Sequence, residues 1–270
     1  MNITFIGGGN MATALIGGIL AKGFDASAIH VVDPVPTARR RLSESLGVAC
    51  FESVQQLVSL DDVIVLAVKP QQMRVVSADL YGRLSDQLVL SIAAGIRLRD
   101  LARWLGGHDR LARCMPNTPA LIGQGISGLY ANQTVSAEQR AQAQGILEAV
   151  GQVVWVHEEE ALDAVTAVSG SGPAYVFYFI EAMQQAAIDA GLDTQTAREL
   201  VLQTMRGATE LAAQSTEPVS VLRERVTSKG GTTERALATL QQHQVAGAIV
   251  QAVHAARVRA TELGEELGSD

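Results

Sequence analysis

The sequence has 270 residues, of which 47% are hydrophobic, and a formal net charge of −7. This length allows one or two domains with a full core, and the apolar content indicates that some surface is covered between subunits. The negative charge and the lack of a basic tract argue against nucleic acid as a partner, and no uninterrupted apolar run is long enough to span a membrane.

Strand and helix patterns alternate through the first half of the chain, which is typical of a parallel α/β sheet. Strands are predicted at residues 2–6, 29–33, near 48, 63–68, 88–92, 111–115, 128–131 and 152–156, and helices at 11–21, 37–46, 54–59 and 137–150. From residue 158 onward every segment has helical periodicity. Helices are predicted at 175–190, 194–214, 219–225 and 232–266, the last with a break near residues 242–243.

The cysteines and histidines indicate neither a disulfide nor a metal site. Cys50 and Cys114 are isolated and are expected to be buried thiols in a reducing cytoplasm. The five histidines are scattered without metal-ligand spacing. Because the first strand begins at residue 2, we expect no N-terminal signal and a cytoplasmic protein.

The first predicted strand runs directly into Gly7-Gly8-Gly9, and a helix follows from Met11. In such a strand–turn–helix unit Gly7 permits the tight turn, Gly9 lets the backbone approach a pyrophosphate, and Ala12 allows close packing of the helix on the strand. Free N–H groups at the helix start supply an anion site. The pattern therefore predicts dinucleotide binding.

Three later loops follow predicted strands, at the edge of the sheet where ligands of open α/β sheets bind. Lys69 either reaches a phosphate or ribose hydroxyl of the cofactor or only caps its strand. The small residues at 93–95 would allow a nicotinamide ribose to lie against the backbone. Prolines on both sides of Asn117-Thr118 make a stiff loop, which either fixes polar groups at a site or is only a turn.

The choice between NADH and NADPH stays open from the residues alone. Asp33 ends the second strand, where an acidic residue would hold ribose hydroxyls or would turn the chain before a proline. Arg39-Arg40-Arg41 follow and are suited to a 2′-phosphate.

The helical half contains two polar glycine-rich turns. Ser171 is expected to cap a long helix with Pro173 in its first turn, and a catalytic serine is not expected there. In the second turn, at residues 226–233, free N–H groups would bind a small carboxylate, with hydrogen bonds from the hydroxyls of Ser228 and Thr233. Ordinary helix capping is the alternative.

Taken together, these motifs make the whole chain resemble a Δ1-pyrroline-5-carboxylate reductase. The resemblance rests on six stretches in order: Ile6-Gly7-Gly8-Gly9-Asn10-Met11, Ala67-Val68-Lys69-Pro70, Ser91-Ile92-Ala93-Ala94-Gly95, Arg113-Cys114-Met115-Pro116-Asn117-Thr118-Pro119, Ser169-Gly170-Ser171-Gly172-Pro173-Ala174-Tyr175 and Ser228-Lys229-Gly230-Gly231-Thr232-Thr233.

The resemblance implies an α/β, mostly parallel, Rossmann-like dinucleotide-binding domain at 1–159 and an all-α domain at 160–270 that dimerises and binds substrate. It implies reduction of the cyclic imine to L-proline by NADPH, with NADH as a substitute, in a homodimer that in some members assembles into a decamer. The implied cofactor contacts are Ile6, Gly7, Gly8, Gly9, Asn10, Met11, Ala67, Val68, Lys69, Pro70, Ala93, Ala94 and Gly95. The residues themselves add Asp33, Arg39 and Asn117 as candidate cofactor contacts.

The implied substrate contacts are Ser228, Gly230, Gly231, Thr232 and Thr233. We expect the Thr233 hydroxyl to hydrogen-bond to the ring nitrogen, as the catalytic group, and the other four residues to hold the carboxylate. Two departures from the family pattern matter. Lys229 stands where many relatives have proline, and Asp33 stands where many have a neutral residue, although the arginines and the family habit favour NADP.

Two other functions share parts of this pattern. β-Hydroxyacid and 6-phosphogluconate-type dehydrogenases combine a Rossmann half with a helical half, but they use a helix lysine as acid and base. Lys229 is the only lysine after residue 69, and it lies in a glycine turn. A cofactor-sensing module would not need the second polar turn.

Overall fold

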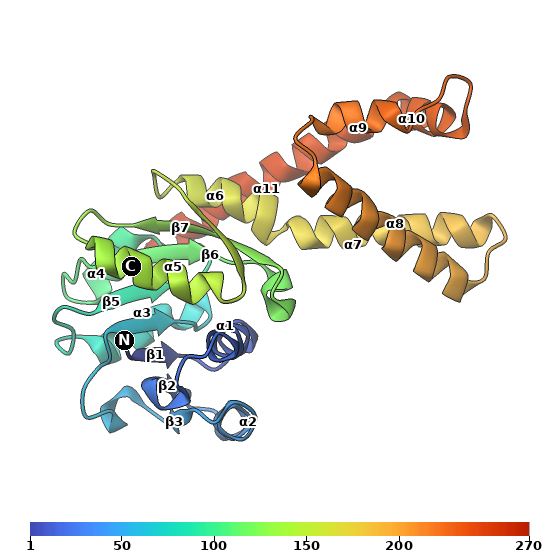
Figure 1. Cartoon of the computed structure of the whole chain (residues 1–270). Helices are drawn as coiled ribbons and strands as arrows, with labels where there is room; N and C mark the ends of the chain where they lie inside the picture. The colour runs from blue at the N-terminus through green and yellow to red at the C-terminus, as the bar shows by residue number, and fades with distance from the viewer. Residues whose placement is uncertain (270) are drawn as a thin grey trace. The chain divides into compact units, whose positions relative to one another are not determined.

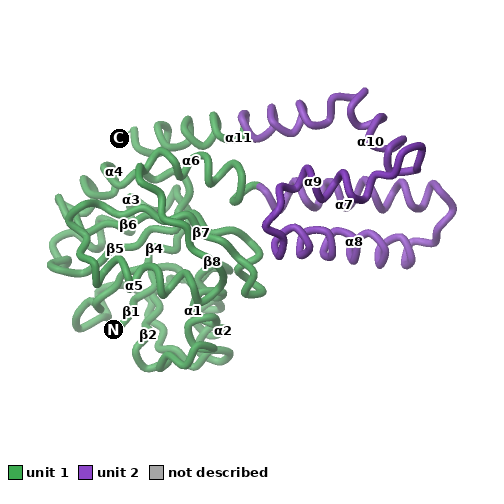
Figure 2. Tube along the Cα trace, turned by 45° about the horizontal axis from the view of Figure 1, so that its top comes forward, with its two compact units in different colours: residues 1–171, 256–270 green, residues 172–255 purple. Residues whose placement is uncertain are grey.

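The computed structural model describes residues 1–269, which fall into two compact units (Figure 2). One contains residues 1–171 and the chain from Ala256 onward, and the other contains residues 172–255. These ranges differ from 1–159 and 160–270 because the last helix returns to the sheet, where Ala260 and Gly264 are buried. The division into domains at residue 159 stays a prediction.

The first unit is built on one eight-stranded sheet in the order β3-β2-β1-β4-β5-β6-β7-β8 (Figure 1). All neighbours pair in parallel except β6 and β7, which are antiparallel. The first six strands have the order of a doubly wound dinucleotide-binding fold, so the predicted fold class is confirmed. The strands are β1 (Ile3–Ile6), β2 (Ile29–Val32), β3 (Ala49–Phe51), β4 (Val63–Leu66), β5 (Leu88–Ser91), β6 (Leu111–Met115), β7 (Gly125–Ala131) and β8 (Gly151–Trp155).

Both faces of this sheet are buried, which explains the uninterrupted apolar runs in its sequence. In β4, Val63 and Val65 belong to one core cluster, whereas Ile64 and Leu66 belong to the other. Helices α1 (Asn10–Ala21), α2 (Pro36–Leu46) and α5 (Ala137–Glu148) contribute to the first cluster, and α3 (Met73–Leu80) and α4 (Leu98–Trp104) contribute to the second.

Two helices and one turn differ most from the sequence predictions. Helices α3 and α4 lie outside the predicted elements, because each is short and presents only one narrow apolar stripe to the sheet. The helix predicted at 54–59 is a single 3₁₀ turn at Val54–Gln56, with hydrogen bonds only between residues three apart. The predicted break in the last helix is confirmed at Gln244, which has a φ of 53°.

The second unit buries very few of its side chains. Among its described residues only Ala197 and Val201 are buried, while Phe177, Tyr178 and Val250 are each more than 60% exposed. Such a helical layer does not close a core of its own. After α6 (Ala161–Val165) and a π-helical turn (Thr166–Gly170), the helices are α7 (Gly172–Asp189), α8 (Thr194–Gln214), α9 (Val219–Arg225), α10 (Thr232–Gln242) and α11 (Val245–Gly268).

Both cysteines are free thiols. Cys114 is buried in the sheet, and desolvation raises the pKa of its thiol, whereas Cys50 is half-buried. Within residues 1–269, no helix is both long and apolar enough to cross a bilayer.

Candidate functional site

The turn after β1 can be made only by glycine at its first position. Gly7 has a φ of 103°, and a Cβ there would lie 2.6 Å from the carbonyl oxygen of Ala67. The Gly7 N–H donates to the carbonyl oxygen of Val32 at 2.8 Å. Gly7 therefore lies between β2 and β4, at the point where the strand order reverses and where such sheets bind ligands.

The start of α1 is open. Gly9 is its N-cap residue, the helix has no side-chain cap and no acidic residue in its first turn, and nothing lies within 4 Å of a Cβ built at Gly9. The N–H groups of Asn10 and Met11 belong to this first turn, so they form an anion site. Ile6 and Ala12 are buried and support the turn by packing.

Side chains from the end of β2 and from α2 hold the middle of the glycine turn. The Gly8 N–H donates to Asp33 Oδ2 at 2.7 Å, and Arg41 Nη2 donates to the carbonyl oxygen of Gly8 at 3.0 Å. Arg39 Nη1 donates to the carbonyl oxygen of Asp33 at 2.7 Å. Of the three arginines, only Arg40 has no hydrogen bond or ion pair within residues 1–269.

The loop after β4 lies against the same turn. The Ala67 N–H donates to the carbonyl oxygen of Ile6 at 2.8 Å, and Val68 Cγ1 lies 3.0 Å from a Cβ built at Gly7. Lys69 is exposed, with no partner for its ammonium in the described chain, and Pro70 begins a 3₁₀ turn. Both interpretations of Lys69 therefore remain open.

The loop after β5 packs on the end of α11. Ala93 is buried and Ala94 is half-buried. Gly95 has a φ of 79°, and a Cβ there would lie 3.1 Å from Leu267 Cδ1. Gly264 approaches from the helix, since a Cβ there would lie 3.3 Å from the carbonyl oxygen of Gly95. Gly95 is thus required for packing, and its contact with nicotinamide stays a prediction.

The Asn117 side chain holds the proline-flanked loop after β6 in place through two hydrogen bonds. Its Oδ1 accepts from the N–H of Ile126 at 3.0 Å, and its Nδ2 donates to Ser169 Oγ at 3.2 Å. Ser169 lies in the π-helical turn, a feature that often occurs at functional sites. These contacts support the stiff-loop interpretation, and the cofactor role of Asn117 stays a prediction.

The second glycine turn belongs to the other unit, where it begins α10. Gly231 is the N-cap residue, its N–H donates to the carbonyl oxygen of Ser228 at 3.0 Å, and the helix has no side-chain cap. Ser228 Oγ lies 2.5 Å from a Cβ built at Gly231, so the hydroxyl lies directly against the turn. Gly230, with a φ of 73°, donates its N–H to Glu234 Oε2 at 2.6 Å.

These contacts leave part of the predicted carboxylate site open. Thr232 and Thr233 are the first two residues of α10, so their N–H groups have no partner within the helix. Among the described residues, the hydroxyls of Ser228 and Thr233 make no hydrogen bond, and Lys229 is exposed without an ion pair. The role of Glu234 was not predicted.

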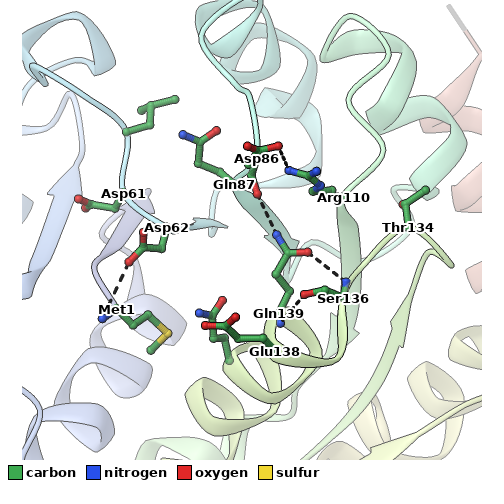
Figure 3. Close-up of a pocket in the computed structure, with 12 residues that line it drawn as sticks. Met1, Asp61, Asp62, Asp86, Gln87, Arg110, Thr134, Ser136, Glu138 and Gln139 are labelled. Carbon is green, nitrogen blue, oxygen red and sulfur yellow. Dashed lines mark hydrogen bonds and ion pairs between the residues drawn. The ribbon is translucent and has the colours of Figure 1, made fainter.

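A cavity of about 570 Å³ lies at the opposite edge of the sheet, where β1, β4 and β5 begin (Figure 3). Two of its acidic groups already have partners: Asp62 accepts from the N–H of Asn2 at 2.8 Å, and Asp86 pairs with Arg110. Open α/β sheets bind ligands at the other edge, so we do not place the cofactor here. In the part of the chain that is described, no group of three metal-binding side chains could hold an ion.

A buried charged cluster in the first unit has no signal in the sequence. Asp163 Oδ2 accepts from Arg97 Nη2 at 2.6 Å and from Thr261 Oγ1 at 2.9 Å, and Arg113 Nη1 pairs with Glu159 Oε1 at 3.0 Å. The cluster joins α4, β6, α6 and α11, and Arg97 and Asp163 are 66 residues apart. Such pairs arise only from tertiary structure.

Known proteins resemble this chain along its whole length. Two family models match, one for pyrroline-5-carboxylate reductase dimerisation over residues 159–263 and one for coenzyme F420-dependent NADP oxidoreductase over residues 2–95. The pyrroline-5-carboxylate reductase of Pseudomonas aeruginosa is 47% identical, with 98% of each chain covered. That of Haemophilus influenzae is 45% identical, with 97% of each covered.

Solved structures agree with these sequence matches. A pyrroline-5-carboxylate reductase from Coxiella burnetii superposes with a TM-score of 0.91 at 42% identity, covering 97% of this chain and 98% of that one. The pyrroline carboxylate reductase of Plasmodium falciparum, solved with NADP bound, superposes with a TM-score of 0.88 at 29% identity, covering 98% of each.

Proposed function

The chain belongs to the pyrroline-5-carboxylate reductase family, and we propose that its two glycine turns bind the cofactor and the substrate of that reaction. The reaction is reduction of the C=N bond of Δ1-pyrroline-5-carboxylate to L-proline, the last step of proline biosynthesis. The observation that carries the site assignment is the open, uncapped start of α1 at Gly9, placed where the strand order reverses.

The proposed cofactor is NADP(H), with NAD(H) as a substitute. The match to an NADP oxidoreductase model over residues 2–95 supports NADP(H), as does the exposed Arg40 on α2, whose guanidinium has no partner within residues 1–269. The amides of Asn10 and Met11 would hold the pyrophosphate, with Ala67 and Val68 beside the turn. When bound, the reduced nicotinamide supplies the hydride.

The substrate site is proposed at the start of α10. The N–H groups of Thr232 and Thr233, the positive end of the helix and the Ser228 hydroxyl would hold the carboxylate. The Thr233 hydroxyl would hydrogen-bond to the ring nitrogen, which keeps the imine oriented for reduction. In the free chain the Gly230 N–H donates to Glu234 Oε2, so a substrate carboxylate can accept from that N–H only after the Glu234 side chain moves.

We further propose a homodimer built through the helices of residues 172–255. The match to a dimerisation model supports this, and so do the exposed apolar side chains of that unit. Assembly of dimers into a decamer rests on the family resemblance alone. The proposed location is the cytoplasm.

The proposed function is tested by incubating the purified chain with Δ1-pyrroline-5-carboxylate and following the absorbance of NADPH, then of NADH. We expect loss of reduced cofactor with matching formation of L-proline. Reactions without the imine, and with a 2-hydroxy acid and oxidised cofactor, serve as controls. Cofactor binding without turnover of the imine would contradict the proposal and favour a sensor.

Gly9→Ala is expected to weaken NADPH binding by about tenfold or more without lowering stability, because its methyl group would occupy the space where the backbone meets the pyrophosphate. Gly9 has a φ of −72°, which alanine adopts without strain. The measurements are the Kd for NADPH and the thermal unfolding midpoint.

The matched control is Gly145→Ala on the exposed side of α5, where a Cβ also meets nothing within 4 Å. It should change neither cofactor affinity nor turnover. Wild-type affinity in Gly9→Ala would remove the α1 start from the cofactor site.

A further inference from the structure

Both oxygens of the Asp33 carboxylate already accept a hydrogen bond from a backbone N–H. Oδ2 accepts from the Gly8 N–H at 2.7 Å, and Oδ1 accepts from the Val35 N–H at 2.8 Å. The backbone of Asp33 is fixed as well, because its N–H donates to the carbonyl oxygen of Phe51 at 3.0 Å and its carbonyl oxygen accepts from Arg39. The side chain is half-buried and points back toward the glycine turn.

The peptide groups on both sides of Gly8 are therefore held from β2 and α2. The N–H is held by Asp33, and the carbonyl oxygen by Arg41 at 3.0 Å. The space around Gly8 is also closed, since a Cβ there would lie 2.6 Å from Leu42 Cδ1. Three consecutive glycines have an unusually large backbone entropy to lose, so external hydrogen bonds decide how well this turn is ordered before a ligand arrives.

We propose that Asp33 is a positioning residue that pre-organises the Gly7–Gly9 turn for the cofactor pyrophosphate, and that it does not bind the adenosine ribose. The inference rests on the proposed function of this edge of the sheet. It also implies that the acidic residue at the end of β2 does not set the choice between NADH and NADPH, which is left to the neighbouring arginines.

The experiment compares NADH with its 2′-deoxyadenosine analogue, which lacks the ribose hydroxyl that an acidic ligand would bind. The Kd of each is measured for the full-length wild type, Asp33→Ala and Asp33→Asn. We expect Asp33→Ala to weaken both cofactors by the same factor, roughly tenfold, because the Gly8 amide loses a charge-assisted hydrogen bond. Asparagine has one carbonyl oxygen, so it can satisfy only one of the two amides, and the loss should be about half as large on a logarithmic scale.

A second readout separates positioning from general damage to the fold. With saturating cofactor, kcat should remain near the wild-type value in Asp33→Asn while the KM for NADH rises. Asp25→Ala is the matched control, because Asp25 Oδ1 likewise accepts a hydrogen bond from a backbone N–H, that of Ser27 at 2.8 Å, at a turn away from the glycines. It should leave both Kd values unchanged.

A wild type that binds NADH more tightly than the deoxy analogue, with this preference lost in Asp33→Ala, would overturn the proposal and make Asp33 a ribose ligand. An unchanged Kd in Asp33→Ala would also overturn it. If Asp33→Ala does not fold, the Kd values of Asp33→Asn for NADH and for the deoxy analogue are compared with those of the wild type in the same way. Turnover of the imine by the wild type is measured separately, so failure of the proposed function is distinguished from failure of this inference.

Discussion

Replacing Thr233 by valine is expected to lower kcat/KM for Δ1-pyrroline-5-carboxylate by about 10- to 100-fold, the value of one hydrogen bond to a charged or developing charged group. Valine keeps the β-branched shape and removes only the hydroxyl. That hydroxyl is half-buried at the start of α10 and makes no hydrogen bond within residues 1–269, so its loss removes no contact of the free chain. Steady-state kinetics with NADPH in excess measure the effect.

Two variants show whether the effect belongs to the ring nitrogen. Thr233→Ser restores the hydroxyl and should recover most of the activity. Thr239→Val, on the same helix, removes a hydroxyl that donates to the carbonyl oxygen of Arg235 at 3.2 Å. This variant should leave kcat/KM for the imine unchanged. Equal kinetics of Thr233→Val and wild type would exclude the proposed catalytic role.

The sheet could be predicted because its signals are local. Three glycines follow a short apolar strand, and the apolar runs after it belong to strands that are buried on both faces. Helices α3 and α4 carried a weaker local signal, with buried residues such as Met73, Ser77 and Leu80 spaced along one face. Short helices with one narrow stripe are defined by what they pack on, which sequence spacing alone does not show.

The roles of individual site residues were harder to predict because their partners are distant in sequence. Asp33 could be read as a ribose ligand or as a turn residue, and only the contact with Gly8, 25 residues away, supports the second. Asn117 depends in the same way on Ser169, and Gly95 on Leu267. Glu234 was missed although a Glu at the third position of a helix often reaches back to a preceding N–H.

Asp163→Ala is expected to lower the free energy of unfolding by about 3–5 kcal/mol, the cost of leaving buried charges without their partner. Asp163 is 3% exposed, and it accepts from Arg97 and Thr261, while Arg113 Nη2 lies 3.9 Å from its other oxygen. Removing the carboxylate leaves the Arg97 guanidinium without its partner in a site with little access to water, while Arg113 keeps its ion pair with Glu159. Urea unfolding at one fixed protein concentration measures the loss, since the stability of an oligomer depends on concentration.

The same substitution should loosen the end of α11 before the sheet unfolds, because Thr261 and Gly264 share one turn of that helix and Gly264 packs on Gly95. Amide hydrogen exchange of residues 256–268 is therefore expected to accelerate under native conditions. Arg259→Ala, which breaks an exposed ion pair with Glu266 on the same helix, is the matched control and should change neither quantity measurably. A decrease of less than about 1 kcal/mol in the free energy of unfolding for Asp163→Ala would contradict the prediction. It would mean that the ion pairs around Asp163 contribute no more than an exposed ion pair and do not hold α11 in place.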